Sequence, residues 1–207
     1  MHSRNPSTSD SGQTRLSLLS RAKARDSVAW RDLVDLYGPL IAFWCRKRNL
    51  DPHATADCVQ EVFSSISRNL AGFQTKQASG AFRAWIWTIA RHKIIDAIRS
   101  RNAHPIPTGG SSANFSMQQV LDPHNVGAFE SLDEPTDEHQ SSALVRRAMG
   151  QVAGGFEPRT WQVFTRTVLD QTATVVVAAE FGISQAAVRQ IRSRVLRRIR
   201  QQLGDME

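Results

Sequence analysis

The chain has 207 residues, with 26 lysine and arginine residues against 19 aspartate and glutamate residues, so its formal net charge is +7. Its hydrophobic residues make up 41% of the chain, which is enough for the core of one large or two small domains. The longest apolar stretches, such as residues 40–45 and 175–179, fall far short of the roughly 20 residues that a membrane-spanning helix needs. We therefore expect no membrane insertion.

The charge is divided into three blocks along the sequence. Residues 1–101 carry 16 basic and 8 acidic side chains. Residues 102–142 carry 6 acidic side chains and no basic ones, and residues 143–207 carry 10 basic and 5 acidic side chains. Two basic segments on either side of an acidic one indicate two separate surfaces for a polyanion such as nucleic acid.

Residues 1–14 are polar and lack the apolar core of a signal peptide, so we expect a disordered tail and a cytoplasmic protein. The two cysteines, Cys45 and Cys58, lie 13 residues apart and match no zinc or redox spacing. We interpret both as reduced side chains in apolar surroundings, and we expect neither a metal nor a cofactor.

Apolar residues recur every three or four positions along the chain, which predicts an all-α protein. Residues 15–48 are expected to form one or two helices, with a possible kink at Gly38 and Pro39. Asp51 and Pro52 then provide the cap and first residue of another helix. That helix carries an apolar stripe opposite a polar face that contains Asp57, Gln60, Glu61, Ser64 and Arg68.

The next predicted helix, residues 81–101, mixes aromatic and basic side chains. Aromatic rings stack on unpaired bases while arginine and lysine hold the phosphates, so such a helix is typical of a platform for single-stranded nucleic acid. We expect Trp85 to lie in the core and Trp87 to be exposed. The alternative is that both tryptophans are core residues and the charged groups only solvate the outer face. The candidate contacts are Trp87, Arg91, His92, Lys93, Asp96 and Arg99.

Residues 102–142 are rich in proline, glycine, serine, asparagine and acidic residues, which predicts a flexible linker. Helices are expected again at about residues 143–152, 158–169, 173–181 and 185–203, with Gly154 and Gly155 between the first two. The pattern predicts two small helical domains, residues 15–101 and 143–207, joined by the linker.

Ala178, Gly182 and Val188 have the spacing of a helix-turn-helix, in which a small residue, a turn glycine and a branched apolar residue are needed for steric reasons. Ser184 can cap the second helix, whose first turns then enter the major groove of DNA. An ordinary helical bundle with a basic helix is the alternative. The candidate base contacts are Ser184, Gln185, Ala186, Ala187, Arg189 and Gln190, and the candidate phosphate contacts are Arg192, Arg194, Arg197, Arg198 and Arg200.

Two segments resemble a known family. Residues 28–101 resemble region 2 of bacterial RNA polymerase sigma factors, through the motifs DCVQEVF at 57–63 and FRAWIWTIARHKIIDAIRSR at 82–101. Residues 143–203 resemble region 4, and the combination is similar to the extracytoplasmic-function (ECF) group of the sigma-70 family. One departure is His92, which stands where the family usually has asparagine.

The resemblance implies a role for each segment. The helix bearing Asp57, Gln60, Glu61 and Phe63 would bind the β′ coiled coil of core RNA polymerase. Residues 81–101 would read and melt the −10 promoter element. Region 4, with Arg159 among its DNA contacts, would read the −35 element and meet the β flap. The resemblance further implies an anti-sigma factor or other regulator as a partner, and no catalytic residue on this chain.

Two other classes remain to be weighed. A stand-alone helix-turn-helix regulator would use residues 28–101 as a sensor or dimerisation domain and would bind duplex DNA without polymerase. A site-specific recombinase would need a nucleophile, but Tyr37 is the sole tyrosine of the sequence and belongs to no recognisable arginine and histidine arrangement.

Overall fold

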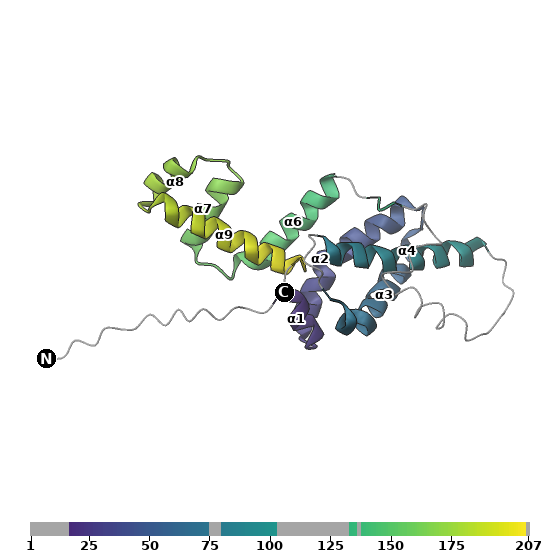
Figure 1. Ribbon diagram of the computed structural model, residues 1–207. Helices are drawn as coiled ribbons and strands as arrows, with labels where there is room; N and C mark the ends of the chain where they lie inside the picture. The colour runs from purple at the N-terminus through teal and green to yellow at the C-terminus, as the bar shows by residue number, and fades with distance from the viewer. Residues whose placement is uncertain (1–16, 75–79, 103–132, 136–137, 206–207) are drawn as a thin grey trace.

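The computed structural model describes residues 17–74, 80–102, 133–135 and 138–205, and within these ranges every regular element is a helix (Figure 1). The prediction of an all-α fold is therefore confirmed. The predicted tail at 1–14 and most of the predicted linker lie outside the described residues. The elements are α1 (Leu18–Lys23), α2 (Ser27–Lys47), α3 (Pro52–Asn69), η1 (Leu70–Gly72), α4 (Ala81–Asn102), α6 (Glu138–Ala153), α7 (Pro158–Val168), α8 (Thr174–Phe181) and α9 (Gln185–Gln202).

Side-chain caps fix the starts of several helices. The Asp26 carboxylate accepts hydrogen bonds from the backbone N–H groups of Val28 and Ala29, which starts α2. Asp51 accepts from the N–H of Ala54, with Pro52 at the first position of α3, as the sequence predicts. Helix α2 continues through Pro39, so the break in residues 15–48 lies before α2 rather than at this proline.

Helices α1, α2, α3 and α4, here called the N-terminal bundle, enclose an apolar core. Its largest fully buried side chains include Tyr37, Trp44 and Phe82. Both thiols, Cys45 and Cys58, are buried and free, as expected. On α4 the apolar residues change faces along the helix.

Helices α6, α7, α8 and α9, here called the C-terminal unit, hold the predicted helix-turn-helix. Helix α6 begins at Glu138, five residues before the expected start at 143. The turn between α8 and α9 has its own small core, made of Val163, Val177, Ala178 and Val188.

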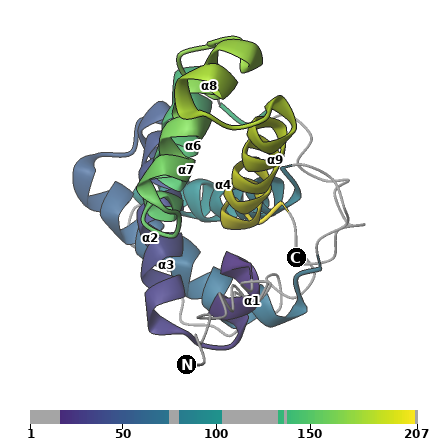
Figure 2. The same cartoon turned by 90° about the vertical axis from the view of Figure 1, so that its left-hand side faces the viewer.

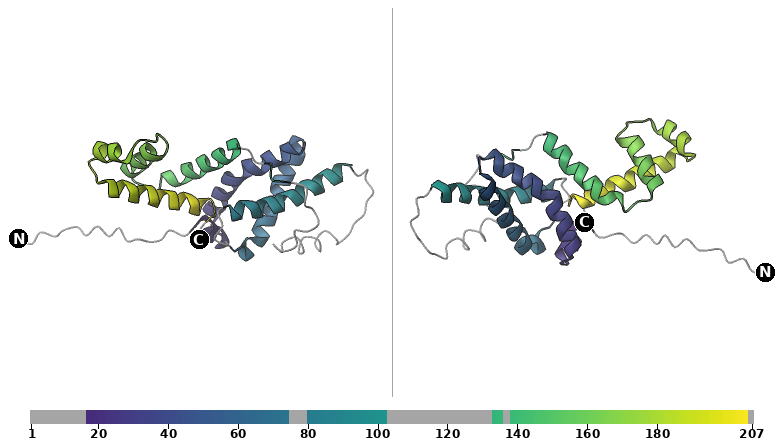
Figure 3. Two further views of the ribbon diagram at one scale, coloured as in Figure 1. Left: turned by 45° about the horizontal axis from the view of Figure 1, so that its top comes forward. Right: turned by 180° about the vertical axis from the view of Figure 1, so that it is seen from behind.

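The two parts share one continuous hydrophobic core in this structure. Leu144, Ala148 and Val152 of α6 and Val195 and Ile199 of α9 belong to the same buried cluster as the core of the N-terminal bundle. Figures 2 and 3 show the end of α9 reaching the bundle beside α1, while the α8 end points away from it. The helix-turn-helix is therefore presented at one end of the molecule. None of the helices in the described ranges is both long and apolar enough to cross a membrane.

Candidate nucleic-acid interface

The turn between α8 and α9 has the geometry that its residue types predict. Gly182 has φ = +61° and ψ = +37°, the left-handed conformation that glycine adopts without steric cost. Ser184 Oγ accepts a hydrogen bond of 3.1 Å from the N–H of Ala187 and so caps α9. Ala178 and Val188 are buried against each other's helices, with 7% and 1% of their surface exposed. The sequence-based prediction of a helix-turn-helix arrangement agrees with these positions.

Helix α9 presents its candidate contacts to solvent. In its first turns Ala187 is half-buried and the other candidates are exposed, namely Ser184, Gln185, Ala186, Arg189 and Gln190. Further along, Arg198 is half-buried while Arg192, Arg194, Arg197 and Arg200 are exposed. A shallow hollow of about 280 Å³ runs along the helix between Arg189, Arg192, Ser193, Leu196 and Arg200. Three guanidinium groups around one hollow suit a phosphate-bearing ligand.

Two other arginines of the C-terminal unit, Arg159 and Arg166, form hydrogen bonds or ion pairs within the chain. The exposed side chain of Arg159 donates to the backbone carbonyl of Phe181 and thereby ties α7 to the end of α8. Arg166 forms ion pairs with Glu180 at 3.0 Å and Asp170 at 3.1 Å, and its hydrogen bond to Glu180 is the main reason that its pKa is raised. Most of the remaining arginines of the C-terminal unit lie on α9.

The polar face of α3 is open to solvent. Asp57, Gln60 and Glu61 are all exposed, whereas Phe63 is buried at 7% exposure and packs edge-on against Trp30 with ring centroids 6.2 Å apart. Phe63 therefore belongs to the support of this face and not to its outer surface. The reason is its position on the apolar stripe of α3, which faces the core.

On α4 the structure corrects one expectation. Trp87 is only 9% exposed, because Trp44 of α2 packs edge-on against it with ring centroids 5.1 Å apart. The prediction that Trp87 is exposed is wrong, and a buried ring has no free face on which a base can stack. Trp85, expected in the core, is partly buried and packs against Phe73 and Phe82.

The other candidate DNA contacts on α4 differ in how far their side chains are exposed to solvent. Asp96 and Arg99 are exposed, and His92 is half-buried with Nδ1 2.6 Å from the carbonyl oxygen of Thr88. Lys93 Nζ lies 2.7 Å from Glu61 Oε2. This ion pair joins α4, the candidate DNA-binding helix, to the polar face of α3. Arg91 is half-buried, and its Nε and Nη2 atoms are buried and find no hydrogen-bond partner among the described residues.

The acidic block contacts the N-terminal bundle through residues that the sequence did not single out. Arg83 Nε on α4 lies 2.7 Å from Glu134 Oε1, and Arg48, the residue that follows α2, donates to the carbonyl of Asp133 at 3.3 Å. The position of an acidic segment between two basic ones indicates that such a contact can form, but it does not identify which arginine is involved. Within the described residues there is also no cluster of side chains suited to a metal ion.

One comparison with known proteins finds a family that matches part of the N-terminal bundle. Residues 33–104 match the family model for sigma-70 region 2. No curated protein matches the chain. Among solved structures, the structure of CnrH in complex with the cytosolic domain of CnrY is similar, at 18% identity and a TM-score of 0.36, covering 92% of this chain and 97% of that one. The matched segment, which is similar to sigma-70 region 2, contains most of α2, all of α3 and the whole of α4.

Proposed function

We propose that this chain is a sigma factor of the ECF group, which binds core RNA polymerase and directs it to promoters with −10 and −35 elements. The observation that carries the proposal is the combination, in one chain, of a region 2 match with an exposed polar face on α3 and a capped, arginine-rich second helix in a helix-turn-helix. A stand-alone regulator would need only the helix-turn-helix.

The polar face of α3 is the proposed docking surface for the β′ coiled coil of polymerase. Asp57, Gln60 and Glu61 point outward, while Val62, Phe63 and Ile66 anchor the same helix in the core. A rigid helix with carboxylates and an amide on its outer face can pair with a basic partner without rearranging. Phe63 contributes by holding the helix in place.

The exposed side of α4 is the proposed −10 surface. Promoter opening on such a surface is binding chemistry, since contacts with captured single-stranded bases offset the cost of unpairing them. His92, Asp96 and Arg99 are suited to base and backbone contacts, and Arg91 and Lys93, half-buried like His92, lie on the same helix. Trp87 supports this surface through its contact with Trp44. Nucleotide addition belongs to the polymerase in this proposal, so the chain itself needs no catalytic group.

The first turns of α9 are the proposed −35 surface. Gln185, Arg189 and Gln190 are exposed next to the capped helix end and are suited to base edges in the major groove. Arg194 and Arg197 further along are suited to phosphates. A regulatory protein partner, such as an anti-sigma factor, and the β flap of polymerase complete the set of proposed partners.

The test is run-off transcription by purified core polymerase on a promoter library, with and without the full chain. Asp57→Ala combined with Glu61→Ala should weaken polymerase binding at least about tenfold, because it removes two carboxylates from the docking face. Asp35→Ala combined with Glu157→Ala removes two exposed carboxylates that lie outside α3, one on α2 and one just before α7, and should leave binding unchanged. Equal polymerase affinity for both double variants would refute the assignment of the α3 face.

A further inference from the structure

The fold brings the two cysteines of the chain together, although they are 13 residues apart in the sequence. Cys45 lies on α2 and Cys58 on α3, and the Cys58 thiol forms a hydrogen bond with the Cys45 thiol. Both side chains belong to the apolar core of the N-terminal bundle, with 0% and 3% of their surface exposed. Since the sequence contains two cysteines, any disulfide within the chain joins these residues. We call Cys45 and Cys58 the thiol pair.

The two thiols differ in acidity. The hydrogen bond from Cys58 is the main reason that the pKa of Cys45 is lowered, and the charge of Arg46 lowers it further. The hydrogen bond to Cys45 and burial together raise the pKa of Cys58. The thiolate is the attacking form in thiol–disulfide exchange. Cys45 is therefore the better nucleophile of the two, and Cys58 lies next to it as a second thiol.

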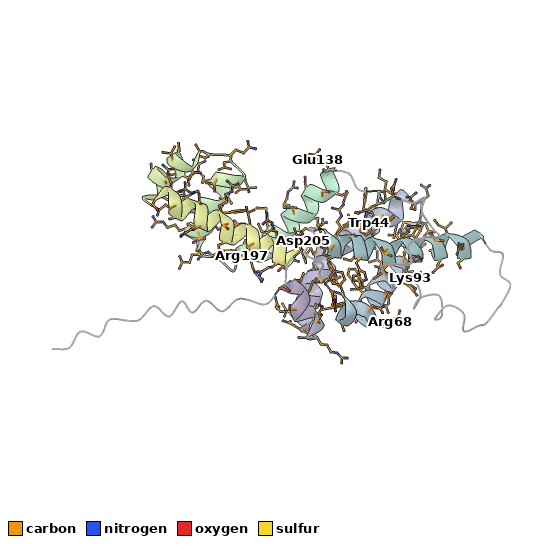
Figure 4. The ribbon with its side chains drawn as sticks, viewed as in Figure 1. Trp44, Arg68, Lys93, Glu138, Arg197 and Asp205 are labelled. Atoms are coloured by element: carbon orange, nitrogen blue, oxygen red, sulfur yellow. The ribbon has the colours of Figure 1, made fainter. Side chains whose placement is uncertain are left out.

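The thiol pair lies close to the ion pair between Glu61 and Lys93. Both charges act on Cys58, because the Lys93 ammonium lowers the pKa of its thiol and the Glu61 carboxylate raises it. Cys58 and Glu61 are three residues apart, within one turn of α3. Figure 4 labels Lys93 on α4 and Trp44, the neighbour of Cys45 on α2. A shift of α3 at Cys58 therefore also moves the Glu61 carboxylate.

We propose that the thiol pair is a redox-active site, which forms a reversible disulfide between α2 and α3 and weakens the docking of polymerase on the polar face of α3. The disulfide follows from the contact between the thiols, whereas its effect on docking rests on the proposed function. An S–S bond is about 2.05 Å long, shorter than the separation of two hydrogen-bonded sulfur atoms. Its formation therefore draws α3 toward α2 and displaces Glu61 relative to Lys93 on α4.

The oxidant in this proposal is a small disulfide such as oxidised glutathione. The Cys45 thiolate attacks one glutathione sulfur, the glutathione S–S bond breaks, and one glutathione leaves and takes up the proton that Cys45 has lost. The deprotonated Cys58 sulfur then attacks the Cys45 sulfur and expels the second glutathione, which takes up the Cys58 proton. The thiol pair loses two electrons and two protons, and the oxidant becomes two reduced thiols. Because both cysteines are buried, the oxidant reaches them through local opening of the bundle.

Equilibration of the full chain in glutathione redox buffers tests the disulfide. Equilibrium is approached from the reduced chain and from the oxidised chain, so that burial affects only the rate. Acid quenching and mass spectrometry of the intact chain measure the fraction that has lost two hydrogen atoms. We expect the equilibrium constant to be at least about tenfold larger in the native chain than in concentrated urea, because the unfolded chain must first close the loop between the thiols. A native constant equal to or below the value in urea would overturn the proposal.

A matched variant separates the contact of the thiol pair from the mere presence of two thiols. Cys58→Ala combined with Ser64→Cys keeps two cysteines, but it moves the second one to an exposed position of α3. This variant should lose the advantage of the native chain over urea. An advantage as large as that of the wild type would show that the contact is not the cause. Cys45→Ala and Cys58→Ala, each with one thiol, should show no loss of two hydrogen atoms.

Binding of core polymerase tests the effect on docking. The oxidised chain, freed of glutathione, should bind at least about threefold more weakly than the reduced chain, the size expected for disturbing one exposed ion pair. Dithiothreitol should restore the affinity. The variant that combines Cys45→Ala with Cys58→Ala, taken through the same treatment, should bind equally before and after it.

The two parts of the proposal can fail separately. Equal polymerase affinity of the reduced and oxidised wild-type chains would overturn the effect on docking. If neither form binds polymerase, the proposed function fails, but the glutathione equilibrium still measures the disulfide.

Discussion

Glu61 and Lys93 form an ion pair that joins the two proposed working surfaces of the N-terminal bundle. The carboxylate lies on the outer face of α3 and the ammonium on α4, with Oε2 and Nζ 2.7 Å apart. The hydrogen bond from Lys93 is the main reason that the pKa of Glu61 is lowered. The Lys93 side chain is 17% exposed, against 61% for Glu61. A basic partner that docks on α3 therefore competes directly with Lys93 for this carboxylate.

The Glu61–Lys93 ion pair should make the stability of the folded chain depend on pH, and the lowered pKa of Glu61 fixes the direction of that dependence. Because the folded-state pKa of Glu61 is lowered, its contribution is fully present above the unfolded-state value of about 4.3 and is lost as the pH falls through the folded-state pKa. Since Glu61 is largely exposed, the contribution should be below about 1 kcal/mol. We expect urea unfolding to show Glu61→Gln as slightly less stable than wild type at pH 7, with the difference vanishing in acid. Asp57→Asn, on the same helix, is the control, and a difference for Glu61→Gln that persists unchanged below the folded-state pKa would contradict the prediction.

Trp87 makes a structural contribution that can be measured. Because it is buried against Trp44, truncation to alanine should cost about 3–5 kcal/mol of unfolding free energy through lost packing and a cavity. Chemical denaturation of the purified chain measures this cost. Thr88→Ala, at the next and exposed position of α4, should cost far less. A Trp87→Ala chain as stable as wild type would show that the ring does not support α4.

Arg189 and Arg194 should have different effects on DNA binding. Arg189 lies in the second turn of α9, beside the capped end, so Arg189→Ala should change the preferred −35 sequence and cost about 1–3 kcal/mol on the preferred site. Arg194 lies beyond the base-reading turns, so Arg194→Ala should weaken binding to all sequences and reduce the slope of log K against log salt by about 1. Binding of the full chain with polymerase to a promoter library, at several salt concentrations, measures both. Identical profiles for the two variants would refute this division between base and phosphate contacts.

The cap of α9 should be needed for its orientation. Ser184→Ala removes the acceptor for the Ala187 N–H and should destabilise the chain by about 1 kcal/mol. Ser184→Asp supplies another acceptor and should restore most of the loss, whereas Ser193→Ala, within the same helix, tests for a general effect of losing an exposed serine. Thermal unfolding followed by circular dichroism provides the measurement. An unchanged midpoint for Ser184→Ala would mean that the cap does not contribute.

The sequence by itself determined the features that depend on neighbouring residues. Asp51 and Pro52 start α3, Ser184 starts α9 and Gly182 makes the turn before it, because caps and left-handed turns are set by one or two residues and the backbone next to them. The outward position of Asp57 and Glu61 likewise follows from helical periodicity. Only the tertiary structure decided which side chains are covered by distant parts of the chain. Trp87 is buried because Trp44 lies over it, and Gly204 is confined because Leu19 and Phe82 surround it; packing partners so far apart along the chain leave no local pattern in the sequence.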